Sequence, residues 1–168
     1  MAGNMVNYNA EGKWSVDSVR ARYRDLKYRF GGSDDFVLEP RTYANPVGIT
    51  WVYNIMDTVA DGVRIGDAAC IELSIDYLKD NVMGSTTGYI RERMARALKQ
   101  AELTNGQKQR LSEIFMTQLR HRRILMEFRE YSRLFRRIGI EPYREEIESL
   151  RNAREAYIQR AVERLLAE

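Results

Sequence analysis

Arginine is the residue whose number and spacing point most clearly to chemistry in this sequence. Five of them lie within sixteen residues in the last third of the chain: Arg122, Arg129, Arg133, Arg136 and Arg137. In a helix they project away from the apolar residues of the same segment. Guanidinium groups bind phosphate and carboxylate through paired hydrogen bonds, which lysine cannot match. The pattern predicts an exposed cationic helix face that can bind an anionic partner.

A shorter basic stripe lies near the start of the chain. Arg20, Arg24 and Lys27 are four and three residues apart, with Tyr28 adjacent. Residues at these intervals share one side of a helix. We expect this stripe to extend the arginine-rich face, so that the eight basic positions together form the candidate partner-binding surface.

Three interpretations of the arginine-rich face compete. It is a solvated surface, a site for a protein partner, or a site for nucleic-acid phosphates. Residues 47–80 carry two Lys or Arg against six Asp or Glu, whereas residues 105–139 carry nine against three. A second copy of the chain could therefore supply the acidic partner. No helix-turn-helix or RNA-binding motif is present, so we favour a protein partner or a homo-oligomer, with nucleic acid as the alternative.

Catalytic motifs are missing from the sequence. It has no glycine-rich loop ending in Lys-Ser or Lys-Thr, no dinucleotide-binding fingerprint and no Gly-x-Ser-x-Gly. The only histidine, His121, lies among Arg120, Arg122 and Arg123, with no nucleophile or orienting group nearby in sequence. We expect His121 to be structural or exposed, and the protein to be a non-enzymatic adaptor or regulatory protein.

Two acidic clusters share helix faces. Asp57 and Asp61 are one turn apart, as are Asp76 and Asp80, with Glu72 a further turn back. Such spacing could hold a cation. Both clusters project opposite the apolar stripe of their own segment, where carboxylates stay solvated. We therefore expect no metal site and no cofactor.

The single cysteine and the hydropathy pattern bear on location. Cys70 has no partner for an internal disulfide, so we expect a small core residue in a reducing compartment. No segment approaches the roughly 20 apolar residues that cross a bilayer, and residues 1–12 lack the apolar stretch of a signal peptide. These features predict a cytoplasmic protein with no membrane contact.

The apolar residues recur at three- and four-residue intervals, which is typical of amphipathic helices. We predict an all-α fold: a compact bundle, or a short array of six to seven antiparallel helices that resembles HEAT-like repeats in architecture. No fixed repeat length supports the second form. The expected helices are 16–30, 46–64, 68–80, 89–101, 105–119, 123–138 and 142–167.

The expected organisation is a flexible tail at residues 1–14 and a single helical domain over residues 15–168, with a long loop at 31–46. Within the helices, the apolar phase shifts between Leu119 and Ile124. One straight helix cannot bury both sets of apolar residues against the same neighbour. We therefore expect a break at residues 120–123.

Overall fold

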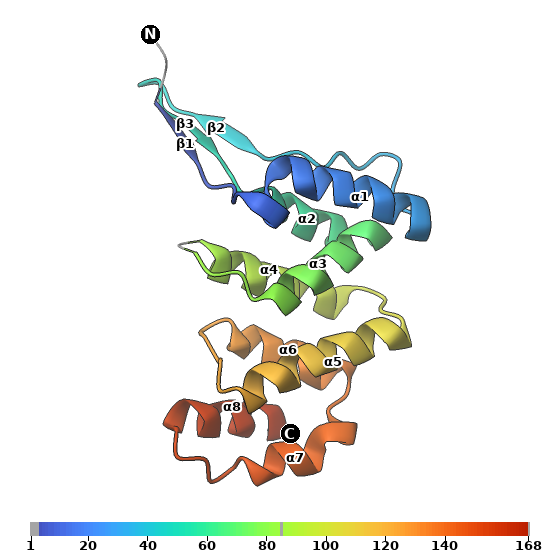
Figure 1. Ribbon diagram of the computed structural model, residues 1–168, viewed down its shortest axis with the longest axis vertical. Coiled ribbons are helices and arrows are strands. Elements are labelled where there is room, and N and C mark those ends of the chain that lie inside the picture. Colours follow the sequence, from blue (N-terminus) through green and yellow to red (C-terminus); the bar gives the residue numbers. More distant parts are fainter. Residues whose placement is uncertain (1–3, 85, 168) are drawn as a thin grey trace. The chain divides into compact units, whose positions relative to one another are not determined.

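The computed structural model of the protein describes residues 4–84 and 86–167 (Figure 1). This part of the chain contains eight α-helices and a small sheet of three strands, which confirms the all-α prediction. The number exceeds the expected six to seven because the last expected helix is divided in two. The chain forms two compact units, Met1–Asp76 and Tyr77–Glu168, where we expected one helical domain; we call them the first and second unit.

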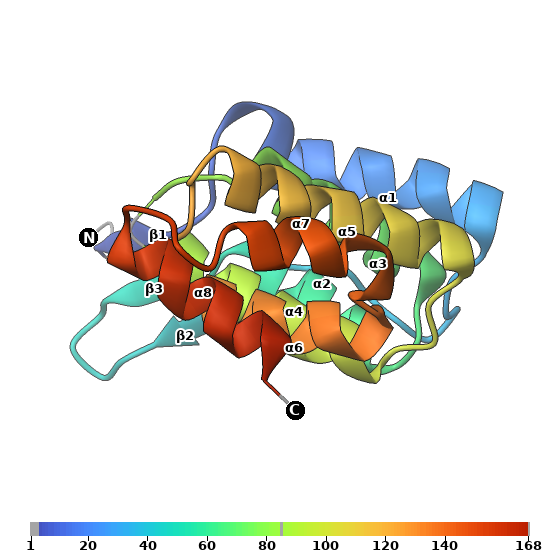
Figure 2. The same ribbon diagram turned by 90° about the horizontal axis from the view of Figure 1, so that it is seen from below.

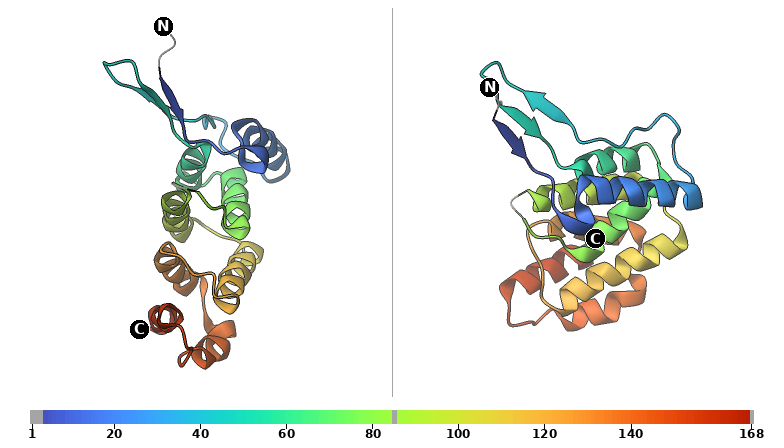
Figure 3. Two further views of the ribbon diagram at one scale, coloured as in Figure 1. Left: turned by 60° about the vertical axis from the view of Figure 1, so that its left-hand side comes forward. Right: turned by 45° about the horizontal axis from the view of Figure 1, so that its top comes forward.

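The first unit contains the sheet and the first helices. Its elements are β1 (Met5–Asn7), a 3-10 helix (Gly12–Trp14), α1 (Val16–Phe30), β2 (Thr42–Ala44), β3 (Thr50–Val52), α2 (Ile55–Arg64) and most of α3 (Ala68–Asp80). The central strand β3 runs parallel to β1 and antiparallel to β2. Figure 3 shows the strands side by side, projecting beyond α1 and α2. In this register Trp51 lies between Val6 and Tyr43, and the Tyr43 and Trp51 rings stack with centroids 5.7 Å apart.

The predicted start of the second helix, at Asn45–Pro46, is wrong because strand β3 occupies Thr50–Val52 before the helix. Asn45 instead closes the turn between β2 and β3, where its side-chain oxygen accepts a hydrogen bond from the Ile49 amide (2.8 Å). Residues 50–52 are β-branched or aromatic, types that favour strands. The helix begins nine residues later, at Ile55 rather than at residue 46, because the Asn54 side chain caps it by accepting from the Met56 amide.

The start of the chain also departs from the expectation. The structure places β1 and a 3-10 helix within residues 1–14, for which we predicted a flexible tail; residues 1–3 lie outside the described part. Trp14 is buried, and the Tyr8 amide donates to the Val52 carbonyl (2.9 Å). Likewise, β2 lies inside the expected loop 31–46. Short strands escape a periodicity search because their pairing partners are distant in sequence.

Capping residues account for the helix ends that were predicted correctly. The Ser15 side chain accepts from the Ser18 amide at the start of α1, and Gly31 ends that helix with a φ of 82°. A φ in this range favours glycine. Thr104 and Gln107 form a reciprocal capping box at the start of α5. These signals are local, so the sequence alone reveals them.

Asp67 fastens three segments of the first unit together. Its carboxylate accepts hydrogen bonds from the Cys70 amide (2.8 Å), the Tyr23 hydroxyl (2.8 Å) and the Ser33 amide (2.9 Å). The first bond caps α3, as expected. Burial raises the pKa of Tyr23, and the hydrogen bond to this carboxylate raises it further. Asp67 is therefore a structural carboxylate rather than part of an exposed acidic face.

The second unit is entirely helical. Its elements are the end of α3, α4 (Thr87–Gln100), α5 (Asn105–Arg120), α6 (Phe128–Ile138), a 3-10 helix (Glu141–Tyr143), α7 (Arg144–Ser149) and α8 (Ala156–Leu166). Helix α6 packs against α4, α5 and α8, and α7 packs against α8. A cluster of rings fills the core around Phe115, whose centroid lies 5.1 Å from that of Tyr131 and 5.6 Å from that of Phe135.

The expected break in the arginine-rich segment is present, but it is longer than predicted. Helix α5 ends at Arg120, whereas α6 begins at Phe128 rather than at residue 123. Arg122 has a φ of 56°, which is incompatible with a continuous helix. Glu127, at the end of the break, is buried. The length of the loop is therefore explained by the burial of Glu127, which ends it. The spacing of the apolar residues from Ile124 onward had predicted an earlier start for α6.

The last expected helix, 142–167, is two helices in the structure. Residues 150–155 separate α7 from α8, as Figure 2 shows. A continuous helix would place Arg154 in the apolar stripe, and this residue is exposed in the structure. The turn at residues 150–155 lets α8 bury its own apolar side: Ile158, Ala161 and Leu165 are buried.

Candidate functional site

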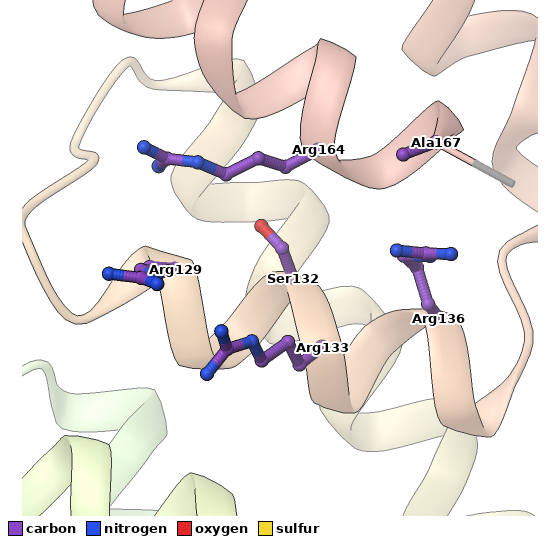
Figure 4. Close-up of a pocket in the computed structure, with 6 residues that line it drawn as sticks. All are labelled: Arg129, Ser132, Arg133, Arg136, Arg164 and Ala167. Carbon is purple, nitrogen blue, oxygen red and sulfur yellow. The ribbon is translucent and has the colours of Figure 1, made fainter.

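A hollow of about 180 Å³ lies between α6 and α8, and arginines dominate its lining. The residues around it are Arg129, Ser132, Arg133, Arg136, Arg164 and Ala167. Figure 4 shows that the first four come from α6, whereas Arg164 comes from α8 and Ala167 directly follows that helix. Ser132 points between the two helices, and the guanidinium groups of Arg129 and Arg164 extend to the same side. Two helices thus present cations to one small space.

The sequence of each helix explains this arrangement. On α6, Arg129, Arg133 and Arg136 are spaced four and three residues apart, so they share one side. The opposite side is held in the core, where Tyr131 and Phe135 are fully buried. On α8, burial of the apolar stripe likewise leaves the arginine of its last turn near the surface. Core packing therefore sets which side of each helix carries the arginines, and their side chains stay exposed.

The charges at the hollow are unbalanced. Arg133 donates to the Glu130 carboxylate (2.6 Å), and Glu130 also lies 3.8 Å from Arg96 Nε. Within residues 4–84 and 86–167, no carboxylate forms an ion pair with the other three arginines of the hollow: Arg129, Arg136 and Arg164. Guanidinium groups gathered without counterions repel one another, and an anion between them relieves that repulsion.

Two of the arginines around the hollow lie near helix ends, and Ser132 lies between the helices. Arg136 and Arg164 lie in the last turns of α6 and α8, where the helix dipole favours cations. Ser132 is buried, and its hydroxyl donates to the Phe128 carbonyl (2.8 Å). The hydrogen-bond donors facing the hollow are therefore the guanidinium groups.

Two of the predicted arginines do not belong to this hollow. Arg122 lies in the loop after α5, where it forms an ion pair with Glu155 (2.5 Å). Arg137 points to a different hollow of about 430 Å³, whose lining includes Lys99 and Lys108. The predicted stripe of five is thus three arginines on one side of α6, one on another side and one in a loop.

The shorter basic stripe lies in the first unit and is largely neutralised there. Arg20 forms ion pairs with Asp17 (3.7 Å) and with Glu39, and Lys27 lies 3.3 Å from Asp34. Arg24 lines a hollow together with Arg20, Tyr23, Phe36 and other residues of α1 and the following loop. Its surroundings are mixed in charge, so this stripe has no cationic excess comparable to the α6–α8 hollow.

Sequence reasoning missed Arg164 and Ser132. The apolar stripe of the last segment does indicate that Arg164 faces away from the core. Nothing local in the sequence indicates that α8 packs beside α6, because this contact depends on the turn at residues 150–155.

The acidic segment 47–80 is engaged within the first unit. Asp61 lies 3.1 Å from Arg41, and Asp76 lies 2.8 Å from Arg22. Glu72 is buried, which corrects the expectation that its carboxylate stays solvated. Asp67 is buried as well. The segment therefore offers few uncommitted carboxylates to a second copy of the chain.

The positions of Cys70, His121 and the acidic groups give no sign of a catalytic or metal site among the described residues. Cys70 is a buried core residue, as expected, and burial raises the pKa of its thiol. His121 is exposed at the end of α5. Among the described residues, no group of three or more His, Cys, Asp or Glu is arranged to hold a metal ion. None of the helices in the described ranges is long and apolar enough to cross a membrane.

Comparisons of the chain with protein-family models, with curated proteins and with solved structures gave no match. The function must therefore be argued from the geometry and charge of the site itself.

Proposed function

We propose that this protein is a non-enzymatic adaptor or regulatory protein that binds an acidic segment of a protein partner at the α6–α8 hollow. One observation carries the proposal: Arg129, Arg136 and Arg164 surround a common space, and no described carboxylate pairs with them. Arginines held by core packing and left without counterions suit bidentate contacts with carboxylates or phosphates on another molecule.

A different protein fits the site better than a second copy of this chain. The acidic segment expected to serve as partner is occupied by internal ion pairs of Asp61 and Asp76 and by burial of Glu72. A complex between copies would have to break these contacts. We therefore place the acidic groups on another protein.

Nucleic acid is the second candidate, favoured by the charge of the second unit. Residues 77–168 contain nineteen Lys or Arg against thirteen Asp or Glu. A phosphate backbone, however, is best tracked by an extended row of cations. Here the row is interrupted, because Arg122 pairs with Glu155, Arg133 pairs with Glu130 and Arg137 lies elsewhere. A compact anionic group suits this arrangement better.

We further infer that α4 to α8 form a short HEAT-like array in a protein of the cytoplasm. The packing of α4 on α6 and of α6 on α8 supports the first inference, because stacked helical hairpins place alternate helices side by side. The free, buried thiol of Cys70 supports the second.

Fluorescence anisotropy with two kinds of labelled probe tests the proposed function. One probe is a Glu-rich peptide, and the other is single-stranded RNA or duplex DNA of equal charge. We expect the peptide to bind the wild-type protein, and an Arg129→Gln/Arg136→Gln variant to lose most of that binding. Arg151→Gln/Arg154→Gln is the matched control, because both arginines are exposed between α7 and α8 and do not line the hollow.

The outcome separates the two candidates. Tighter binding of nucleic acid than of peptide, falling steeply between about 50 and 200 mM salt, would replace the proposal by its alternative. Equal loss of peptide binding in the two double variants would show that general charge, rather than the hollow, is responsible.

A further inference from the structure

We propose that the α6–α8 hollow recognises a phosphoryl group, carried by a phosphorylated side chain in the acidic segment of the partner. The inference rests on the proposed function and adds the chemical class of the ligand. It follows from the directions and the charge of the hollow, which favour phosphate over carboxylate, and from its size, which suits one small anionic group.

The directions of the donors suit a tetrahedral group. Arg129, Arg133 and Arg136 approach from α6, whereas Arg164 approaches from α8 on the other side of the space (Figure 4). A carboxylate presents two oxygens in one plane, which one or two guanidinium groups satisfy. A phosphoryl group presents three acceptor oxygens in different directions. Donors that line one hollow from two helices therefore match the phosphoryl group more fully.

The charge of the hollow suits a dianion. Four guanidinium groups line it, and within the described part of the chain Glu130 is the carboxylate that forms an ion pair with one of them, Arg133. A partner carboxylate adds one negative charge and leaves an excess of positive charge. A phosphorylated side chain carries about −1.5 to −2 at pH 7, so it neutralises more of this excess in a single contact.

The size of the hollow suits one such group. Its volume of about 180 Å³ is below the roughly 300–1,000 Å³ of pockets that enclose drug-sized ligands. The buried Ser132 closes the space between the helices, and its hydroxyl proton is already used by the Phe128 carbonyl. Ser132 therefore donates no hydrogen bond to the ligand, and the guanidinium groups alone determine which anion binds.

Isothermal titration calorimetry with three matched peptides tests the inference. The peptides consist of Glu, Ala and Gly residues around one central position, which is phosphoserine, glutamate or serine. We expect the phosphoserine peptide to bind about tenfold more tightly than the glutamate peptide at pH 7.5, because the phosphoryl contacts are more numerous and doubly charged. At pH 5, below the second phosphate pKa of about 6, this preference should shrink.

Variants connect the preference to the hollow. Arg164→Gln and Arg129→Gln should each abolish most of the preference for phosphoserine, whereas Arg151→Gln should keep it. Arg164→Lys keeps the charge but loses the bidentate geometry, so it should lose much of the preference too. Thermal unfolding of each variant confirms that the fold is intact.

The outcomes distinguish this inference from the proposed function. Equal affinity for the phosphoserine and glutamate peptides, both sensitive to Arg129→Gln, would overturn the phosphoryl assignment and leave the proposed function standing. No binding of any peptide would remove both. Binding of inorganic phosphate as tight as that of the phosphopeptide would overturn the assignment to a protein-borne group.

Discussion

Arg91 and Glu127 form a buried ion pair in the second unit. Arg91 donates to one oxygen of the Glu127 carboxylate through both Nε (2.9 Å) and Nη2 (2.6 Å), and the two side chains are 2% and 5% exposed. Arg91 also donates to the Val82 carbonyl. Glu127 immediately precedes α6, so this pair fixes where the helix begins and hence the direction of Arg129.

Removing one partner of this pair should destabilise the protein strongly. Glu127→Gln leaves the Arg91 guanidinium buried without a counter-charge, which costs about 3–5 kcal/mol. Urea unfolding measures the loss. Glu92→Gln serves as the control, because its ion pair with Arg96 is half exposed and contributes less than about 1 kcal/mol. Similar losses in the two variants would contradict a structural role for the buried pair.

Gly62 allows α2 and α3 to approach closely. A Cβ at this position would overlap the Cys70 sulfur and lie 2.9 Å from Phe36 Cζ. Gly62→Ala gains about 1 kcal/mol in helix propensity, but overpacking costs about 1–3 kcal/mol. We expect net destabilisation in urea unfolding, with part of it recovered in a Gly62→Ala/Cys70→Ala variant. A Gly62→Ala protein more stable than wild type would contradict this packing.

An ion pair between α5 and α7 predicts a pH dependence of stability. Arg120 donates to both oxygens of Glu146 (2.6 and 2.8 Å), which lowers the pKa of that carboxyl in the folded state. A lowered pKa stabilises the fold above the unfolded pKa of about 4.3 and ceases to do so as pH falls further. Wild type should therefore exceed Glu146→Gln in urea midpoint at pH 7, and the difference should shrink below about pH 4. A difference that grows on acidification would contradict the assignment.

The carboxylate beside the hollow should weaken anion binding. Glu130→Gln removes the negative charge paired with Arg133, so the hollow becomes more positive. A unit charge at about 4 Å is worth roughly 1 kcal/mol in water, so affinity for the Glu-rich peptide should rise about fivefold. Glu145→Gln, at an exposed position on α7, should leave the affinity unchanged. Weaker binding by Glu130→Gln would argue against an anion in the hollow.

The elements that the sequence predicted well are those with local signals. Ser15, Gly31, Asp67 and Thr104 cap or end their helices through bonds to residues within four positions. Strand β3 has no such signal. Its stability comes from pairing with β1, more than forty residues earlier, and with β2, so the spacing of the apolar residues placed the whole strand inside the expected helix 46–64.

The candidate site was predictable only in part, for the same reason. The alignment of Arg129, Arg133 and Arg136 is a property of one helix and follows from their spacing. The loss of Arg122 from the row depends on the loop that precedes the buried Glu127. The addition of Arg164 depends on the packing of α8 against α6. Both are tertiary effects that no local pattern contains.

Anion binding by the arginines between α6 and α8 is the property on which the proposed function depends. Nuclear magnetic resonance of arginine side-chain Nε–H groups, recorded while the Glu-rich peptide is added, measures this directly. We predict that the signals of Arg129, Arg136 and Arg164 shift together and saturate with one binding constant, while those of Arg151 and Arg154 stay in place. Shifts spread evenly over exposed arginines, or confined to residues outside the hollow, would contradict the account.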